Sequence, residues 1–140
     1  MPSTRARRPR RERGSITPFV VLAVPTLVVL VGLVTDGGGQ IQGSTHAQHV
    51  ASSAARYATG EISGEAISGG SLTINPVAAE QSAREFVAAS GLEGTAHVNG
   101  DTVTVTVTGK YQTKFLSIIG INELNYSASA SAKLINSPED

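Results

Sequence analysis

The stretch "RRERGSITPFVVLAVPTLVVLVGLVTDGGG", residues 10–39, decides how this chain is organised. It holds a cluster of arginines, then 22 uncharged positions from Gly14 to Thr35, then an aspartate and three glycines. A helix of 22 residues extends about 33 Å, which matches a hydrocarbon core of about 30 Å. Thirteen of the positions are Ile, Leu, Val or Phe, which insert favourably into a bilayer. The run predicts a transmembrane helix over residues 15–35, with the lipid bilayer as a partner.

Two prolines interrupt the apolar run. Pro18 falls in the first helical turn, where a missing backbone N–H matters little. Pro25 falls in the middle, where we expect it to kink the helix or to leave the carbonyl of Val21 or Leu22 without its helical partner.

Charge is distributed unequally between the two sides of the run. Six arginines and one glutamate precede it, whereas ten acidic and five basic residues lie from Asp36 onward. The positive-inside rule therefore predicts residues 1–14 as a basic cytoplasmic tip and residues 36–140 as extracytoplasmic. A basic arm that binds nucleic acid is the other interpretation of the arginines. A membrane span that follows directly makes it the weaker one, so we expect no nucleic-acid partner.

A cleaved secretory signal is the main alternative to an anchor, because it also combines basic and apolar segments. Its apolar region usually has 7–15 residues and ends at a small-x-small site. Here the run is longer and ends in "VTDGGG". These features favour an anchor that stays on the cell membrane.

The segment after the span, residues 36–59, reads as a hinge followed by an Ala-rich helix. Gly37–Gly39 give the hinge, and small residues then recur every three or four positions, at Gly43, Ala47, Ala51, Ala54 and Ala58. Such a face lets another helix approach closely. The alternative is that it packs on the chain's own sheet, and both can hold along different turns.

Asp36 lies at the outer end of the span and has two interpretations. The simpler is that its charge ends the apolar stretch at the membrane interface. The sharper is that it pairs with the N-terminal amine or a basic group of a neighbouring subunit. Asp36 and the small-residue face are therefore the candidate interface residues.

Residues 60–140 predict a small extracytoplasmic domain. Residues 60–74 are rich in Gly and Ser and read as a loop. A helix should then begin at Pro76, with Asn75 as its N-cap and Gly91 just past its end. Its apolar face is Ala79, Ala83, Phe86 and Val87.

The remaining sequence alternates with the period of strands. Asn99–Gly100 predicts a hairpin turn, with valines and threonines alternating after it. Residues 124–134 alternate again, with alanines on one face and serines on the other. "KFLSIIGI", residues 114–121, should form a short helix or bend that closes one end of the core. The predicted fold class is α+β, with about three antiparallel strands and one helix packed on their Val/Ala face.

Residues that carry chemistry are few. The absence of cysteine excludes disulfides, thiolate metal sites and cysteine nucleophiles. His46 and His49 have a spacing that brings two imidazoles to one metal, but no further ligand completes a set, so we expect both to be exposed. His97 should lie on the surface. We therefore predict no catalytic, cofactor or metal site, no small-molecule substrate, and a protein that is not an enzyme.

Two quoted segments together carry a family resemblance. "RERGSITPFVVLAVPTLVVLVGLVTDGGGQIQ" (residues 11–42), followed by "HAQHVASSAARYA" (residues 46–58), resembles the TadE/TadG-like proteins of the Flp (Tad) pilus system. Residues 103–134 resemble the end of short members more loosely. The resemblance implies a non-enzymatic, pseudopilin-like envelope protein, often actinobacterial, that takes part in building an adhesive pilus. It also implies a long N-terminal helix that packs against other pilus subunits.

The resemblance also points to a processing junction. Processed members are cut by a prepilin peptidase after a glycine, which places the junction between Gly14 and Ser15. Those members carry Glu at the fifth position after the cut, where this chain has Phe19. Members with the "RGSITPF" form are commonly not processed and are TadG-like, so cleavage and branch both stay open.

Three functions follow from the sequence. The first is a membrane-anchored pilus assembly protein or minor pseudopilin that acts through helix packing and protein contacts. The second is a membrane-tethered extracytoplasmic binding module that uses the sheet and the loop at residues 60–74. The third, and weakest, is a small hydrolase that uses His46 or His49.

Overall fold

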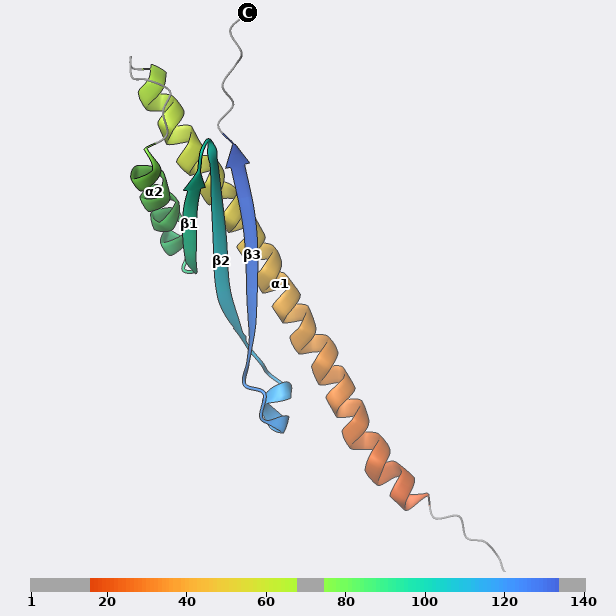
Figure 1. Ribbon diagram of the computed structural model, residues 1–140. Coiled ribbons are helices and arrows are strands. Elements are labelled where there is room, and N and C mark those ends of the chain that lie inside the picture. Colours follow the sequence, from red (N-terminus) through yellow and green to blue (C-terminus); the bar gives the residue numbers. More distant parts are fainter. Residues whose placement is uncertain (1–15, 68–74, 134–140) are drawn as a thin grey trace, which may run out of the picture.

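The computed structural model of this chain describes residues 16–67 and 75–133. In chain order the elements are α1 (Thr17–Ile67), α2 (Pro76–Ala89), β1 (Glu93–Asn99), β2 (Thr102–Gln112), the 3-10 helix η1 (Leu116–Ile119) and β3 (Glu123–Lys133). Figure 1 shows α1 as a long rod, with the sheet and α2 packed beside its C-terminal half. The predicted α+β class, with three antiparallel strands and a long apolar N-terminal helix, is confirmed.

Helix α1 is one continuous helix of 51 residues. It continues without a break through Pro25 and through Gly37–Gly39, so the hinge expected at the glycines is not present as a break in the helix. It also extends to Ile67, into the segment predicted as a loop; the rest of that predicted loop, residues 68–74, lies outside the described residues. Tertiary packing is the physical reason. The C-terminal half of α1, α2, the sheet and η1 form one packed unit, which we call the outer domain, and it holds the helix on both sides of the glycines.

The sheet has the order β1-β2-β3, and both pairs are antiparallel. The register pairs Asn99 with Thr102, so the two-residue turn is Gly100–Asp101, one residue later than the sequence predicted. Gly100 has φ +63°, a left-handed conformation that favours glycine at this position. The valines of β2 that alternate with threonines are fully buried, as their period of two predicted.

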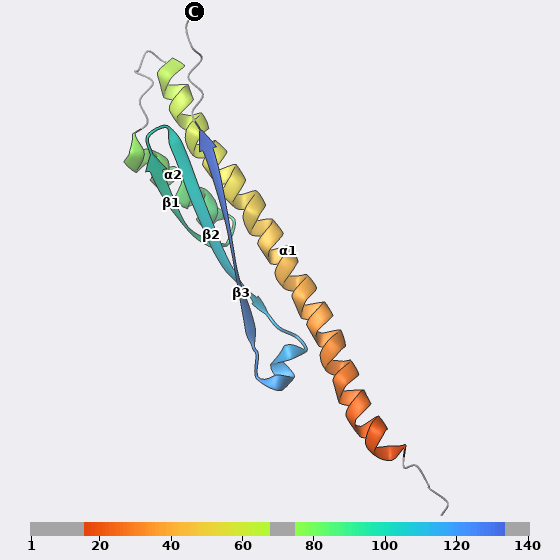
Figure 2. The same cartoon turned by 45° about the vertical axis from the view of Figure 1, so that its right-hand side comes forward.

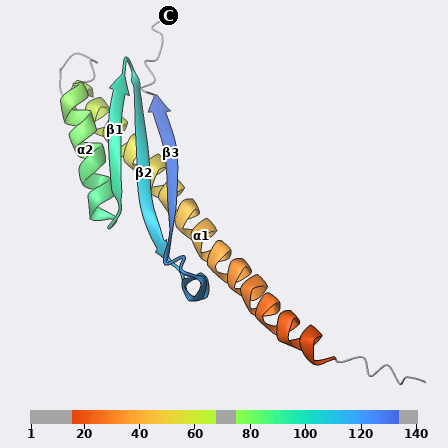
Figure 3. The ribbon, with the colours of Figure 1, turned by 60° about the horizontal axis from the view of Figure 1, so that its bottom comes forward.

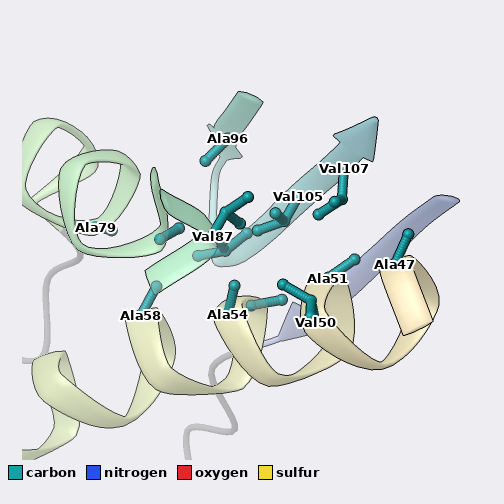
Figure 4. Packing of buried hydrophobic residues seen from close by; sticks show 13 residues of the cluster. Ala47, Val50, Ala51, Ala54, Ala58, Ala79, Val87, Ala96, Val105 and Val107 are labelled. Carbon is teal, nitrogen blue, oxygen red and sulfur yellow. The ribbon is translucent and has the colours of Figure 1, made fainter. Parts of the chain in front are cut away.

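Two helices cover the Val/Ala face of the sheet, rather than the one expected. Figure 2 and Figure 3 show α2 alongside β1 and α1 running across β2 and β3. The second helix is the Ala-rich part of α1, and the alanine column of β3 packs near it rather than under α2. Small side chains on both elements allow this close approach. Figure 4 shows the resulting core, which contains Ala47, Val50, Ala51, Ala54 and Ala58 from α1, Ala79 and Val87 from α2, and Ala96, Val105 and Val107 from the sheet.

Helix α2 has the ends that the sequence predicted. The Asn75 side chain accepts hydrogen bonds from the backbone N–H groups of Val77 (3.2 Å) and Ala78 (3.4 Å). Gly91, just past the end, has φ +75°. The predicted apolar face is buried at Ala79, Ala83 and Val87, and Phe86 is partly buried against the core.

Side chains from the helices cover the edges of the sheet. On β3, the Gln40 amide donates to the Asn125 carbonyl (2.9 Å) and the Gln48 amide donates to the Ser129 carbonyl (3.1 Å). On β1, a Glu80 carboxylate oxygen accepts the Val98 N–H (3.1 Å). Open strand edges invite pairing with other chains, and each of these bonds occupies a backbone group that another strand could use.

Candidate membrane anchor and the Asp36 junction

The N-terminal half of α1 presents an apolar surface that no other described part of the chain covers. Its Leu, Val and Phe side chains are exposed, including Leu27, Leu30 and Val34. In the described part of the chain, α1 is the one helix long and apolar enough to cross a membrane. Water-soluble monomers rarely expose so large an apolar patch, so lipid is a suitable environment for this half of the helix.

Asp36 is the first charged residue beyond this surface, and it is fully buried within the chain (0% exposed). Its carboxylate accepts the backbone N–H groups of Lys114 (2.9 Å), Phe115 (2.9 Å) and Leu116 (2.7 Å). Helix η1 has no side-chain cap from its own flanking sequence. Asp36 therefore satisfies the N–H groups at the start of η1 from a position about 80 residues earlier in the chain.

These contacts determine the charge state of Asp36. Burial raises the pKa of the carboxyl, but hydrogen bonds from the Leu116, Lys114 and Phe115 N–H groups and from the Tyr111 hydroxyl lower it more. The net pKa lies below the ordinary value, so Asp36 is ionised at neutral pH. Neither interpretation of Asp36 from the sequence included these partners. The carboxylate is used within the chain.

Aromatic rings lie against glycines on the same side of α1. A Cβ added to Gly32 would be 2.7 Å from the Phe115 Cβ, and one added to Gly43 would be 2.6 Å from the Tyr126 ring. A Cβ added to Gly39 would overlap the Tyr111 ring. Only glycine leaves room for these rings. The contact face of α1 therefore begins inside the predicted span, at Gly32.

The candidate interface residues on the small-residue face all turn toward the chain's own domain. Ala47, Ala51, Ala54 and Ala58 are completely buried in the core, and Gly43 packs under Tyr126. Of the two alternatives from the sequence, packing on the chain's own sheet is the one that the structure shows. Gly14 and Ser15, the processing junction, lie outside the described residues.

The histidines are exposed, as predicted. His46 and His49 lie on the surface of α1, and His97 lies on the open face of β1. Within residues 16–67 and 75–133, no group of three or more His, Cys, Asp or Glu side chains is arranged to hold a metal ion.

Sequence reasoning did not identify Gly32, Gly39, Tyr111 or Tyr126 as part of this junction. A signal was present, because Gly32, Asp36, Gly39 and Gly43 are spaced by four, three and four residues. That spacing continues the alanine face toward the N-terminus on the same side of the helix. The glycines were interpreted as flexible, whereas the structure uses their small size.

Comparison with known protein families matches residues 14–71 to a family described as "Putative Flp pilus-assembly TadE/G-like". The match includes the apolar half of α1, Asp36 and the small-residue face. No curated protein and no solved structure matches the chain. The resemblance of residues 11–58 is confirmed by this match, which identifies a TadE/G-like Flp pilus-assembly domain over residues 14–71, whereas the looser resemblance of residues 103–134 stays a prediction.

Proposed function

We propose that this chain is a single-pass membrane protein of Flp (Tad) pilus assembly, a pseudopilin-like subunit or assembly factor that acts through protein contacts and not as an enzyme. The family match supports the association with pilus assembly. The observation that carries the proposal is that one helix, α1, provides both the exposed apolar surface and half of the core of the outer domain. Such a helix fixes the position of the outer domain relative to the membrane segment.

The orientation in this proposal comes from charge. The six arginines before the span keep the N-terminus in the cytoplasm, and residues 36–140 are then extracytoplasmic. The small-residue face is buried within the chain, so contacts with other subunits would use surfaces that the fold leaves exposed. The apolar half of α1 is such a surface, and it offers helix packing within the membrane.

The membrane-tethered binding module stays the alternative. An open groove lies at the start of β1 and beside the neighbouring parts of β2 and β3, lined by Leu92, Glu93, Lys110 and Tyr126 among others. Its lysine is paired with Glu123 at 3.2 Å. An open groove of this kind supports ligand binding less well than an enclosed pocket does.

Deletion and complementation test the function. We expect deletion of the gene to reduce surface filaments and adhesion, and the unaltered chain to restore them. The variant Leu27→Arg/Leu30→Arg should fail to restore them, because an arginine at the centre of a span costs about 2.5–3.5 kcal/mol. The matched control is Val77→Arg, at an exposed position of the outer domain, which should restore filaments. Unchanged filament number after deletion would refute the proposal.

Single cysteines test the topology, because the natural chain has none. On intact cells, a membrane-impermeant maleimide should label Val77→Cys. In chains that keep residues 1–14, it should label Ser3→Cys only after permeabilisation. The reverse pattern would overturn the orientation. The intact mass and N-terminal sequence of protein from membranes and from sheared filaments then separate a chain that starts at Ser15 from a full-length anchor.

A further inference from the structure

The connection between β2 and β3 extends away from the core toward the N-terminal half of α1 (Figure 1, Figure 2). Residues 115–121, which we call the apolar loop, expose Phe115, Ile118 (74% exposed), Ile119 (54%) and Ile121. In the described chain beyond Asp36, the other exposed large apolar side chains lie far apart in the sequence, at Ile41, Tyr57 and Val77. Single exposed apolar residues are ordinary, but four in seven residues indicate an interaction surface.

The apolar loop has a fixed height relative to the predicted span. Asp36 holds the backbone at Lys114, Phe115 and Leu116, and Phe115 packs on Gly32. Gly32 lies three residues before the end of the span at Thr35, which is about 5 Å along the helix axis. The loop therefore sits beside the outer end of the span. At the same height on α1, the side chains of Leu33 and Val34 are also exposed and apolar.

The backbone of the loop region is suited to an apolar environment. Asp36 accepts three of its N–H groups, and the N–H groups of Thr113, Ile118, Gly120 and Ile121 donate to carbonyls within the same connection at 3.0–3.1 Å. The Ser117 hydroxyl also donates internally, to the Lys114 carbonyl (3.2 Å). Backbone groups can leave water for the headgroup region at little free-energy cost only where they are hydrogen-bonded within the protein. Lys114, exposed at the border of the loop, carries an ammonium group of the kind that attracts lipid phosphates.

We propose that the apolar loop inserts into the boundary between headgroups and acyl chains in the outer leaflet, beside the span, with lipid as its partner. The inference rests on the membrane anchoring proposed above. Segments at this boundary are typically buried by about 5–10 Å, which agrees with the height that Gly32 gives to Phe115. The chain then contacts the bilayer at two places, the span and the apolar loop. The second contact fixes the side of α1 on which the outer domain touches the membrane surface.

Site-specific fluorescence in liposomes tests this on the full chain. We would introduce Ile118→Cys in the apolar loop, and in separate proteins the control Val77→Cys, which is similarly exposed (70%) at the start of α2, and Leu27→Cys in the span. Each cysteine carries an environment-sensitive dye, in liposomes of phosphatidylcholine and phosphatidylglycerol with or without a lipid that bears a nitroxide quencher high on its acyl chain. The expected result is blue-shifted emission and several-fold stronger quenching at Ile118 than at Val77.

The Leu27 label separates the two proposals. If Leu27 is not quenched by lipid, membrane anchoring itself fails. If Leu27 is quenched and the Ile118 dye is as exposed to water as the Val77 dye, the anchor stands and loop insertion is wrong. If the Ile118 dye is shielded from water but lipid does not quench it, and the shielding grows with protein density in the liposome, a second copy covers the loop and the lipid assignment is overturned.

Discussion

A single carboxylate joins α1 to the connection between β2 and β3. Asp36 follows the apolar run, and the three N–H groups that it accepts belong to the connection between the last two strands. A buried charge is tolerated only where such partners are in place, because desolvation otherwise drives the group to its neutral form. The position of η1 beside α1 therefore depends on the ionised state of one side chain.

We expect Asp36→Asn to destabilise the outer domain. An asparagine oxygen accepts fewer of the three N–H groups, and its own NH₂ group would point at donors. The thermal unfolding midpoint of the full chain in detergent, followed by circular dichroism, should fall by roughly 5–10 °C. The control is Asp101→Asn, a more exposed carboxylate paired with Lys133 at 3.3 Å, which should change the midpoint much less. Equal shifts for the two variants would contradict the role given to Asp36.

The same contact predicts a dependence on pH. The folded pKa of Asp36 is lower than that of the unfolded chain, so between the two values only the unfolded state binds the proton. The contribution of Asp36 to the free energy of unfolding is then complete above about pH 5 and is lost as the pH falls through the folded pKa. The stability difference between the natural chain and Asp36→Asn should shrink on acidification. A difference that stays constant down to about pH 2.5 would refute the linkage.

At the scale of elements, α1 keeps its helical form where its sequence is poorest in helix formers. Each glycine among Gly37–Gly39 costs about 1 kcal/mol relative to alanine in an isolated helix. The three are not equivalent in the structure, because Gly39 faces the Tyr111 ring while Gly37 and Gly38 have open space around them. The small size of glycine is needed at Gly39. At Gly37 and Gly38 glycine only lowers the stability of the helix.

This difference predicts opposite effects for two neighbouring substitutions. Gly38→Ala should stabilise the protein by up to about 1 kcal/mol through helix propensity. Gly39→Ala should destabilise it by up to about 2 kcal/mol, because the new methyl group would overlap the end of the Tyr111 side chain and force it away, which outweighs the gain in helix propensity. Denaturant unfolding of both variants in the same detergent measures the difference. A stabilising Gly39→Ala would show that the Tyr111 contact is weak.

The elements that could be predicted are those with local signals. Asn75 and Pro76 mark the start of α2, and alternation marks β2 and β3, because caps and side-chain period act over a few residues. The length of α1 and the place of η1 depend on contacts such as Asp36 with Leu116, 80 residues apart. No local pattern shows which loop will donate its N–H groups to a buried carboxylate. Local propensity alone therefore predicted a hinge at the glycines. It also predicted that residues 114–121 would close one end of the core.

At the scale of the whole molecule, the outer domain uses only part of α1. Its core takes residues from Ala47 to Ala58, and the junction adds Asp36, Gly39 and Gly43. The side chains of the apolar half contribute little to it beyond the contact of Gly32 with Phe115. The fold of the domain and the anchoring of the chain are therefore separable in energy, although one helix serves both.

A truncated chain tests this separation. Residues 35–140 should be soluble and should unfold cooperatively, with circular dichroism of mixed helix and strand, because they retain Asp36 and the whole core. Residues 50–140 serve as the matched control and should show no cooperative transition, since they lack Asp36, the tyrosine-facing glycines and Ala47. Loss of the cooperative transition in the longer fragment would show that the domain needs the rest of α1.

The unbroken helix also makes the molecule a lever. From Asp36 to Ile67 it extends about 48 Å beyond the predicted span. Spans commonly tilt by about 20°, and a tilt of that size displaces the far end of α1 sideways by about 16 Å. The Gly100–Asp101 turn lies toward that end (Figure 1) and would travel with it. A change in bilayer thickness that changes the tilt of the span would therefore move the end of the outer domain farthest from the membrane.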